Sequence, residues 1–153
     1  MAVNDSGQIG MLLTRREDTS AAGSLLPGKW TIMFKSSQDS GSIFTDGDPF
    51  YDSSAYEAWN PRISFVSPDS PEFVVVWEQH YDHRGAEIFC RTGSMSDDLS
   101  QHNWGNTQTI SFLDGKDSAE PDLAVYQDTA FIGWQDYENG YWEIRVKGIN
   151  WEN

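Results

Sequence analysis

Trp59 stands in a segment with Tyr51 and Tyr56, where aromatic side chains suit the binding of a sugar ring. The flat, apolar face of a Trp packs against the apolar face of a sugar, while its N–H remains free to donate a hydrogen bond. The alternative is a Trp that covers the seam between two structural units. Trp59 is therefore a candidate ligand-binding residue.

Two of the three histidines lie in the segment His80-Tyr81-Asp82-His83-Arg84. Zinc binds histidine nitrogens, but the spacing places no third ligand beside this pair. The segment is therefore interpreted as a polar loop that lines a ligand pocket, with Tyr81, His83 and Arg84 as contacts. Tyr137 and Glu138 occupy the corresponding place later in the chain and are assigned to the same rim.

Carboxylates suggest two further kinds of chemistry. Asp46, Asp48 and Asp52 lie close together, and calcium takes oxygen ligands from such loops. Their spacing is not that of an EF-hand, so a solvated turn is the alternative, and no cofactor is required. Glu87 and Glu143 suggest acid–base catalysis. Both lie among apolar neighbours, however, which favours an ion pair across strands or between structural units.

The elements that must position these residues come from a unit that recurs three times. Anchored on Ala2, Ser64 and Ala124, successive copies are offset by 62 and 60 residues. Each copy contains short runs rich in Val, Ile, Phe and Trp, bounded by turn residues and without helical periodicity, so each run is predicted to be a strand. A repeat of this kind indicates stacked β units.

Each unit is predicted to be an antiparallel meander. First strands are expected at 1–4, 62–66 and 123–126, second strands at 8–13, 73–78 and 130–135, third strands at 29–35, 86–91 and 142–147, and fourth strands at 42–45 and 107–112. The second strands are almost continuously apolar, which predicts that both faces of their sheets are covered. The chain is therefore predicted to be all-β, a single propeller-like domain of three blades at about 1–57, 58–118 and 119–153.

The turn after the third strand resembles a known motif. The first unit reads Ser37-x-Asp39-x-Gly41-x-x-Phe44, and the second reads Ser96-x-Asp98-x-Ser100-x-x-x-Trp104. In such a turn the Asp accepts backbone N–H bonds, the Gly adopts a positive φ, and the aromatic ring packs against the sheet. Both copies resemble the Asp box, and nearly the whole chain resembles the bacterial neuraminidase repeat of sialidase-like propellers.

Alternating strand directions assign the loops to faces. Loops 14–28, 79–85 and 136–141 share one face with 46–60 and 113–121, and the short first-to-second turns share the other face with the Asp-box turns. The first group is long, charged and aromatic. The ligand site is therefore expected on that face.

The resemblance implies sialidase activity, but the residues give it little support. Sialidases bind the substrate carboxylate with three converging arginines, and Arg62 is the only Arg at a position that resembles this triad. Arg62 is therefore kept as a ligand-binding candidate only. The favoured function is a noncatalytic, lectin-like propeller that binds glycans. The alternatives are a sialidase-like glycoside hydrolase or other small-molecule enzyme acting in the central funnel of a dimer, and a structural or protein-interaction module.

Charge and blade number limit the partners. Propellers typically have 4–8 blades, so a homodimer that completes a six-bladed ring is predicted. The net charge of −14 argues against a nucleic acid or an anionic membrane as a partner. Cys90 is the single cysteine, so no internal disulfide forms. No apolar run has the length of a signal peptide or a membrane span, and a soluble protein is expected.

Overall fold

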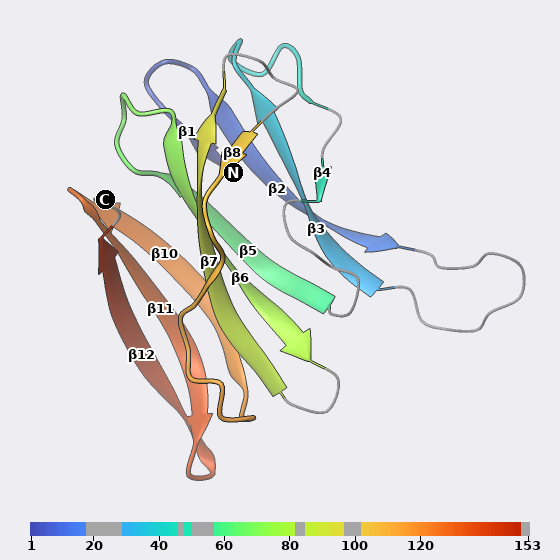
Figure 1. The fold of residues 1–153 in the computed structure, drawn as a ribbon, viewed down its shortest axis with the longest axis vertical. Helices are drawn as coiled ribbons and strands as arrows, with labels where there is room; N and C mark the ends of the chain where they lie inside the picture. Colours follow the sequence, from blue (N-terminus) through green and yellow to red (C-terminus); the bar gives the residue numbers. More distant parts are fainter. Residues whose placement is uncertain (18–28, 46–47, 50–56, 82–84, 97–101, 151–153) are drawn as a thin grey trace, which may run out of the picture.

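The fold consists of strands in three antiparallel sheets that follow one another along the chain. The computed structural model describes residues 1–17, 29–45, 48–49, 57–81, 85–96 and 102–150. Among these residues there is no helix, so none is present that could span a membrane. The predicted all-β class and antiparallel order are confirmed (Figure 1).

Each sheet is built from strands that are consecutive in the sequence. The first sheet contains β1 (Ala2–Val3), β2 (Ile9–Glu17), β3 (Lys29–Ser37) and β4 (Asp48–Pro49). The middle sheet contains β5 (Glu57–Phe65), β6 (Glu72–Tyr81), β7 (Gly85–Met95) and β8 (His102–Trp104), with β9 (Gln108–Thr109) also paired to β7. The third sheet contains β10 (Ser118–Tyr126), β11 (Thr129–Glu138) and β12 (Tyr141–Asn150).

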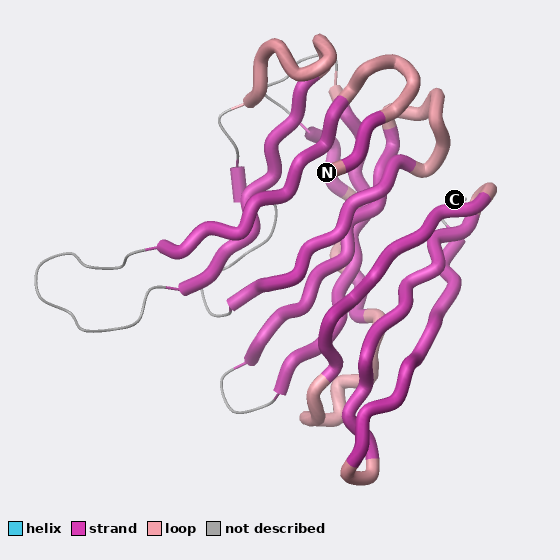
Figure 2. The backbone as a smooth tube through the Cα atoms, turned by 180° about the vertical axis from the view of Figure 1, so that it is seen from behind, coloured by secondary structure: helices cyan, strands magenta, loops and turns pink. Residues whose placement is uncertain are grey.

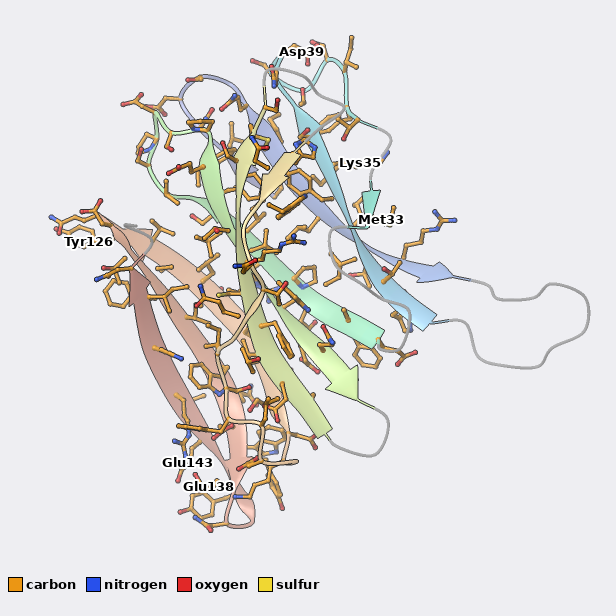
Figure 3. The ribbon with its side chains drawn as sticks, in the orientation of Figure 1. Met33, Lys35, Asp39, Tyr126, Glu138 and Glu143 are labelled. Carbon is orange, nitrogen blue, oxygen red and sulfur yellow. The ribbon has the colours of Figure 1, made fainter. Side chains whose placement is uncertain are left out.

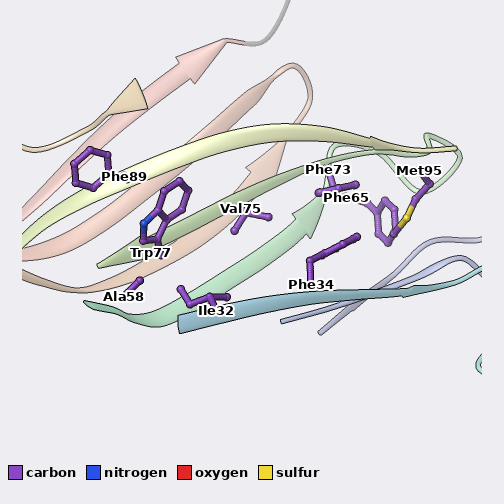
Figure 4. Packing of buried hydrophobic residues seen from close by; sticks show 9 residues of the cluster. All are labelled: Ile32, Phe34, Ala58, Phe65, Phe73, Val75, Trp77, Phe89 and Met95. Atoms are coloured by element: carbon purple, nitrogen blue, oxygen red, sulfur yellow. The ribbon is translucent and has the colours of Figure 1, made fainter. Parts of the chain in front are cut away.

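The middle sheet lies between the other two and supplies most of the core (Figures 1 and 2). Side chains alternate along β6, so Phe73, Val75 and Trp77 pack toward the first sheet. Val74 and Val76 pack toward the third sheet. Figure 4 shows the first of these two clusters, where Ile32 and Phe34 of β3 meet the middle sheet. The continuous apolar run of β6 therefore has both faces covered, as predicted.

The third sheet differs, because only one of its faces is covered within the described chain. Ala130, Ile132 and Trp134 of β11 are buried against the middle sheet. Phe131, between them in sequence, points the other way and is 43% exposed. The cover predicted for this second face is not supplied by the described residues of the single chain, and its supply by a second copy stays a prediction.

One predicted strand and one predicted loop are corrected by the structure. Residues 42–45, predicted to be a strand, belong to a turn, and the fourth strand of the first sheet is β4, which pairs with Met33 and Phe34. Segment 136–141, predicted to be a long loop, is a hairpin in which β11 and β12 extend to a two-residue turn. The turn is Asn139-Gly140 with φ values of 54° and 91°. Two successive positive φ values are those of a type I′ turn, which fits the right-handed twist of a hairpin.

The turn after β3 has the hydrogen bonds expected from its residues. The Asp39 carboxylate accepts a bond from the Ile43 N–H at 2.9 Å and another from the Ser37 hydroxyl at 2.7 Å. Gly41 has a φ of 90°, which glycine adopts without steric cost. These bonds lower the pKa of Asp39, the one from Ile43 contributing most. The corresponding turn in the middle sheet includes residues outside the described part of the chain.

Candidate functional site

A β-bulge interrupts the first strand, an edge strand, of both the middle and the third sheet. The register of β5 shifts between Trp59 and Arg62, and that of β10 shifts between Ala119 and Asp122. In each bulge the residue before a proline has a positive φ, 49° at Asn60 and 52° at Glu120. Such a conformation costs a non-glycine residue on the order of 1–3 kcal/mol, so surrounding contacts must hold it. Strained backbone of this kind is concentrated at functional sites.

Glu78 supplies those contacts from β6. Its carboxylate is almost buried and accepts hydrogen bonds at 3.0 Å from the Asn60 side chain and at 3.0 Å from the Glu120 backbone N–H. The other carboxylate oxygen lies 2.5 Å from Nε2 of His80. One side chain therefore ties both bulges together and joins the middle sheet to the third sheet.

The charges of this pair stabilise each other. Burial raises the pKa of Glu78, but the hydrogen bonds from His80, from the Glu120 N–H and from Asn60 outweigh burial, so the pKa is lowered. The hydrogen bond to Glu78 raises the pKa of His80 against the effect of burial, and the charges of Glu78, Glu57 and Asp117 act in the same direction. The arrangement therefore favours a carboxylate beside an imidazolium.

The third sheet repeats this contact with donor and acceptor exchanged. Gln135 donates from its amide to the Glu120 carboxylate at 2.6 Å. In the middle sheet the bulge residue Asn60 is the amide and Glu78 is the carboxylate. The exchange preserves an amide–carboxylate pair at the equivalent place, on the face of the third sheet that points away from the middle sheet.

An aromatic ring and an exposed ion pair complete the cluster. The Trp59 side chain is 36% exposed, and its ring lies 4.5 Å from the His80 ring at a 39° tilt. Beyond the bulges, Arg62 Nε lies 3.7 Å from Asp122 Oδ1, and both side chains are well exposed. The term bulge site is used below for Trp59, Asn60, Arg62, Glu78, His80, Glu120, Asp122 and Gln135.

The structure unites only part of the predicted ligand site. Trp59 and Arg62 belong to the bulge site. Tyr137 and Glu138 are adjacent in β11 and therefore point to opposite faces of the third sheet. The Tyr137 ring packs against Trp142 at 5.3 Å on the outer face. His83, Arg84 and the side chain of Tyr81 lie outside the described residues.

Glu138 is engaged by cations on the inner face of the third sheet. Its carboxylate contacts Arg145, and its other oxygen lies 3.8 Å from Lys116 Nζ. Arg145 also pairs with Asp136 at 2.6 Å and with Glu143 at 3.4 Å. Figure 3 shows Glu138 and Glu143 at the end of the sheet opposite Tyr126. Ion pairing is therefore found for Glu143, although its partner lies in the same strand.

Glu87 does not form the ion pair expected of it. Its side chain is 2% exposed and accepts a hydrogen bond from the Ser111 hydroxyl at 2.5 Å. Among the described residues it has no cationic partner. Burial, reinforced by the nearby carboxylates of Asp114, Asp136 and Asp117, raises the pKa of Glu87 to about 7 despite the bond from Ser111.

Metal binding stays a prediction. Asp46 and Asp52 lie outside the described residues, and only the backbone of Asp48 is described, in β4. Within the described ranges no group of three or more His, Cys, Asp or Glu side chains is placed to hold a metal ion.

An open cavity of about 1200 Å³ lies where β5 and β10 end, away from their bulges. Its walls include Ile63, Phe65 and Tyr126, and its rim includes Asp5 and Glu72. It opens beside the short first-to-second turns, whereas the bulge site lies near the start of β5 and the end of β6.

Sequence reasoning did not select Asn60, Glu78, His80, Glu120, Asp122 or Gln135 as ligand-binding residues. A signal was available, because Asn60-Pro61 and Glu120-Pro121 occupy equivalent places in the repeat. A proline within a strand removes a backbone donor and marks an edge strand or a bulge. Two such prolines at equivalent places indicate that the bulge is a regular feature of the repeat.

The fold and site define an all-β chain of three stacked sheets with an aromatic and polar cluster at the seam between two of them. No model of a known protein family matches the chain, and no curated protein is detectably similar to it. A functional assignment therefore depends on the residues and geometry of this chain alone.

Proposed function

We propose that this chain is a noncatalytic, lectin-like propeller module that binds a glycan at the bulge site. The observation that carries the proposal is the Trp59 ring, which is partly exposed and held against His80 beside a row of oriented polar side chains. A ring fixed in this way loses little conformational freedom when a sugar stacks on it.

The polar part of the site matches the hydroxyl groups of a sugar. Glu120 and Asp122 offer acceptors, Arg62 offers donors, and Gln135 offers both. Glu120 and Gln135 are oriented by their mutual hydrogen bond, and Arg62 and Asp122 by their ion pair. A small number of placed polar groups beside an aromatic surface is the usual composition of a small-ligand site.

The charge balance of the site selects among glycans. Glu78, Glu120 and Asp122 contribute three carboxylates, against the cations Arg62 and His80. The whole chain carries a net charge of −14, which adds to the repulsion of anions. Neutral or amino sugars are therefore favoured as ligands over acidic sugars such as sialic acid.

Among the described residues, neither Glu78 nor Glu87 is a suitable acid for the enzyme alternative. Glu78 contacts both bulges, but its lowered pKa and three hydrogen bonds keep it ionised and occupied. Glu87 has a raised pKa, but its side chain is buried and hydrogen-bonded to Ser111. A glycosidase needs a protonated carboxyl that reaches the scissile bond.

The proposal includes the blade identity of the three sheets. The order of the sheets, the covered faces of the middle sheet and the hydrogen-bonded turn at Asp39 support blades of the sialidase-like, Asp-box type. It also includes a homodimer that completes the ring.

The test compares two tryptophans of nearly equal exposure. A glycan array identifies ligands among neutral and amino sugars, and isothermal titration then measures affinity for the wild type, Trp59→Ala and Trp30→Ala. Trp59 is 36% exposed and Trp30 is 37% exposed, so Trp30→Ala is a matched control. Trp59→Ala is expected to weaken binding by at least about tenfold, because stacking is lost. Equal losses in both variants, or no glycan bound at millimolar concentration, would contradict the proposal.

A further inference from the structure

The outer face of the third sheet is apolar and open. The pairs Gly133–Val146, Gln135–Ile144 and Tyr137–Trp142 lie on this face, because directly paired residues of antiparallel strands share a face. Ile144 is 75% exposed and Val146 is 67% exposed. Isoleucine and valine in the middle of a sheet are normally covered by another layer.

The equivalent face of the middle sheet packs against a neighbouring sheet. Val76 pairs with Arg62 directly after the β5 bulge, and Gly133 pairs with Asp122 directly after the β10 bulge. Aligned on the bulges, Ile88 corresponds to Ile144 and Cys90 to Val146. Ile88 and Cys90 are buried against the third sheet. The exposed face of the third sheet therefore has the side chains that the middle sheet uses to hold its neighbour.

The first sheet repeats the pattern. Ile32 and Phe34 of β3 correspond to Ile88 and Cys90, and both are buried against the middle sheet. In two of the three copies, then, this face packs on a following sheet within the same chain. The third copy retains the apolar side chains but has no following sheet among the described residues.

The first sheet presents the complementary face. Met11, Leu13 and Met33 lie on its outer side, with Leu13 paired to Met33. Aligned on the repeat, Leu13 corresponds to Trp77 and Met33 to Phe89, two residues of the middle sheet that are buried against the first sheet. Leu13 is 40% exposed. One end of the stack thus offers the face that the other end lacks.

A basic residue recurs on the same side of each third strand. Lys147 reaches across the seam, with its Nζ 3.5 Å from the backbone oxygen of Ile110 in the middle sheet. Lys35 is the equivalent of Lys147 and pairs with Met11 on the outer face of the first sheet. An incoming sheet would therefore meet an apolar surface with a lysine placed to cross the seam.

We propose that the outer face of the third sheet binds the outer face of the first sheet of a second copy, and that two copies related by a two-fold axis close a ring of six sheets. This inference rests on the blade part of the proposed function and not on glycan binding. A two-fold axis forms the seam twice, so each copy contributes both of its open faces. A stable interface buries roughly 800 Å² on each partner. One apolar patch of a few hundred Å² falls short of this area, but the two seams of a ring together approach it.

The first experiment measures mass by sedimentation velocity at tens of micromolar protein and physiological salt. The wild type is expected to sediment with twice the monomer mass. Ile144→Asn is expected to raise the dissociation constant at least about a hundredfold, because two seams each lose an apolar contact. Ile43→Asn is the matched control, since Ile43 is also an isoleucine and is 64% exposed, but lies in a turn. A monomeric wild type, or equal loss in both variants, overturns the proposal.

The second experiment tests which faces meet. Leu13→Asn weakens the opposite face and is expected to be monomeric like Ile144→Asn. In an equal mixture of the two variants, a mixed dimer combines both substitutions in one seam and leaves the other seam intact. Partial recovery of the dimer mass is therefore expected, whereas no recovery would contradict a two-seam ring. Mass that grows continuously with concentration would indicate an open filament and also overturn closure.

A third measurement separates this inference from the proposed function. Trp59, Glu78, His80 and the Arg62–Asp122 pair lie within one chain, whereas Gln135 is directly opposite Ile144 on the open face of the third sheet. Leu13→Asn, which changes the first sheet and no neighbour of the bulge site, is therefore expected to retain glycan binding as a monomer. A wild type that binds glycan but stays monomeric overturns the dimer alone, and a wild type that dimerises but binds no glycan overturns the proposed function alone.

Discussion

Glu87→Gln is expected to stabilise the protein in alkaline solution and to change it little in acid. The wild-type carboxyl is buried, its pKa is raised from 4.5 to about 7, and no cation compensates its charge among the described residues. The Gln side chain has the shape of the protonated acid and can accept the same bond from Ser111, which is 2.5 Å away in the wild type. The substitution therefore removes the charge and retains the packing.

The sign follows from proton binding. The folded state binds the proton of Glu87 more tightly than the unfolded state, so wild-type stability falls as the pH rises from 4.5 through about 7. One pKa unit corresponds to about 1.36 kcal/mol, which makes the full loss at most about 3 kcal/mol. Glu87→Gln does not suffer this loss. The difference in unfolding free energy between variant and wild type should therefore be below about 1 kcal/mol near pH 5 and approach 3 kcal/mol above about pH 8.

Urea denaturation of both proteins at several pH values measures this difference, and other titrating groups cancel because both proteins contain them. Glu143→Gln is the control, since Glu143 is the repeat equivalent of Glu87 but its side chain is 37% exposed and lies beside Arg145. The control is expected to change stability by less than about 1 kcal/mol. A Glu87→Gln effect that is the same in acid and base would refute the assignment of a buried, uncompensated carboxyl.

Two further predictions concern hydrogen-bonded carboxylates. The pKa of His80 is raised from 6.5 by Glu78, whose own pKa is lowered from 4.5, so the pair stabilises the fold fully between these values, and the His80 contribution is lost as the pH rises through its folded pKa. His80→Ala should thus lower the urea midpoint most between pH 4.5 and 6.5, and a loss that grows in base would contradict the pairing. Asp39→Ala should lower the melting temperature at neutral pH by removing the acceptor for the Ile43 N–H. Because the pKa of Asp39 is lowered from 3.8, the difference should shrink as the pH falls below that value, and an unchanged melting temperature at pH 7 would show that the turn does not need this acceptor.

The sequence was informative wherever a local pattern determined burial. The run Phe73–Trp77 predicted a strand covered on both faces, and the structure buries its alternate residues in two clusters. For the third sheet the same reasoning predicts a cover that the described residues of the single chain do not supply, because continuity of apolar residues describes the need for cover and not its source. Phe131 is apolar for the same reason as Val74 but remains open to solvent.

The site was harder to predict because distant contacts determine it. The positive φ of Glu120 depends on a hydrogen bond to Glu78, which is 42 residues away in the chain. No local preference of a Glu-Pro pair predicts that conformation, because proline disfavours it in the preceding residue. The prediction that Tyr137 and Glu138 share one rim is wrong for a local reason, because it treats residues 136–141 as a loop. Asn139-Gly140 is a strong hairpin signal and places these neighbours on opposite faces of a strand.

Chemical labelling of Cys90 can measure how often the seam between the middle and third sheets opens. Its thiol is buried, and burial raises its pKa to about 12. Only about one thiol in 10⁵ would be ionised at neutral pH, and the thiolate is the reactive form. Alkylating reagents therefore reach this sulfur chiefly when the two sheets separate. The rate of labelling reports the frequency of that local opening, and it does so for one seam without requiring the other to open.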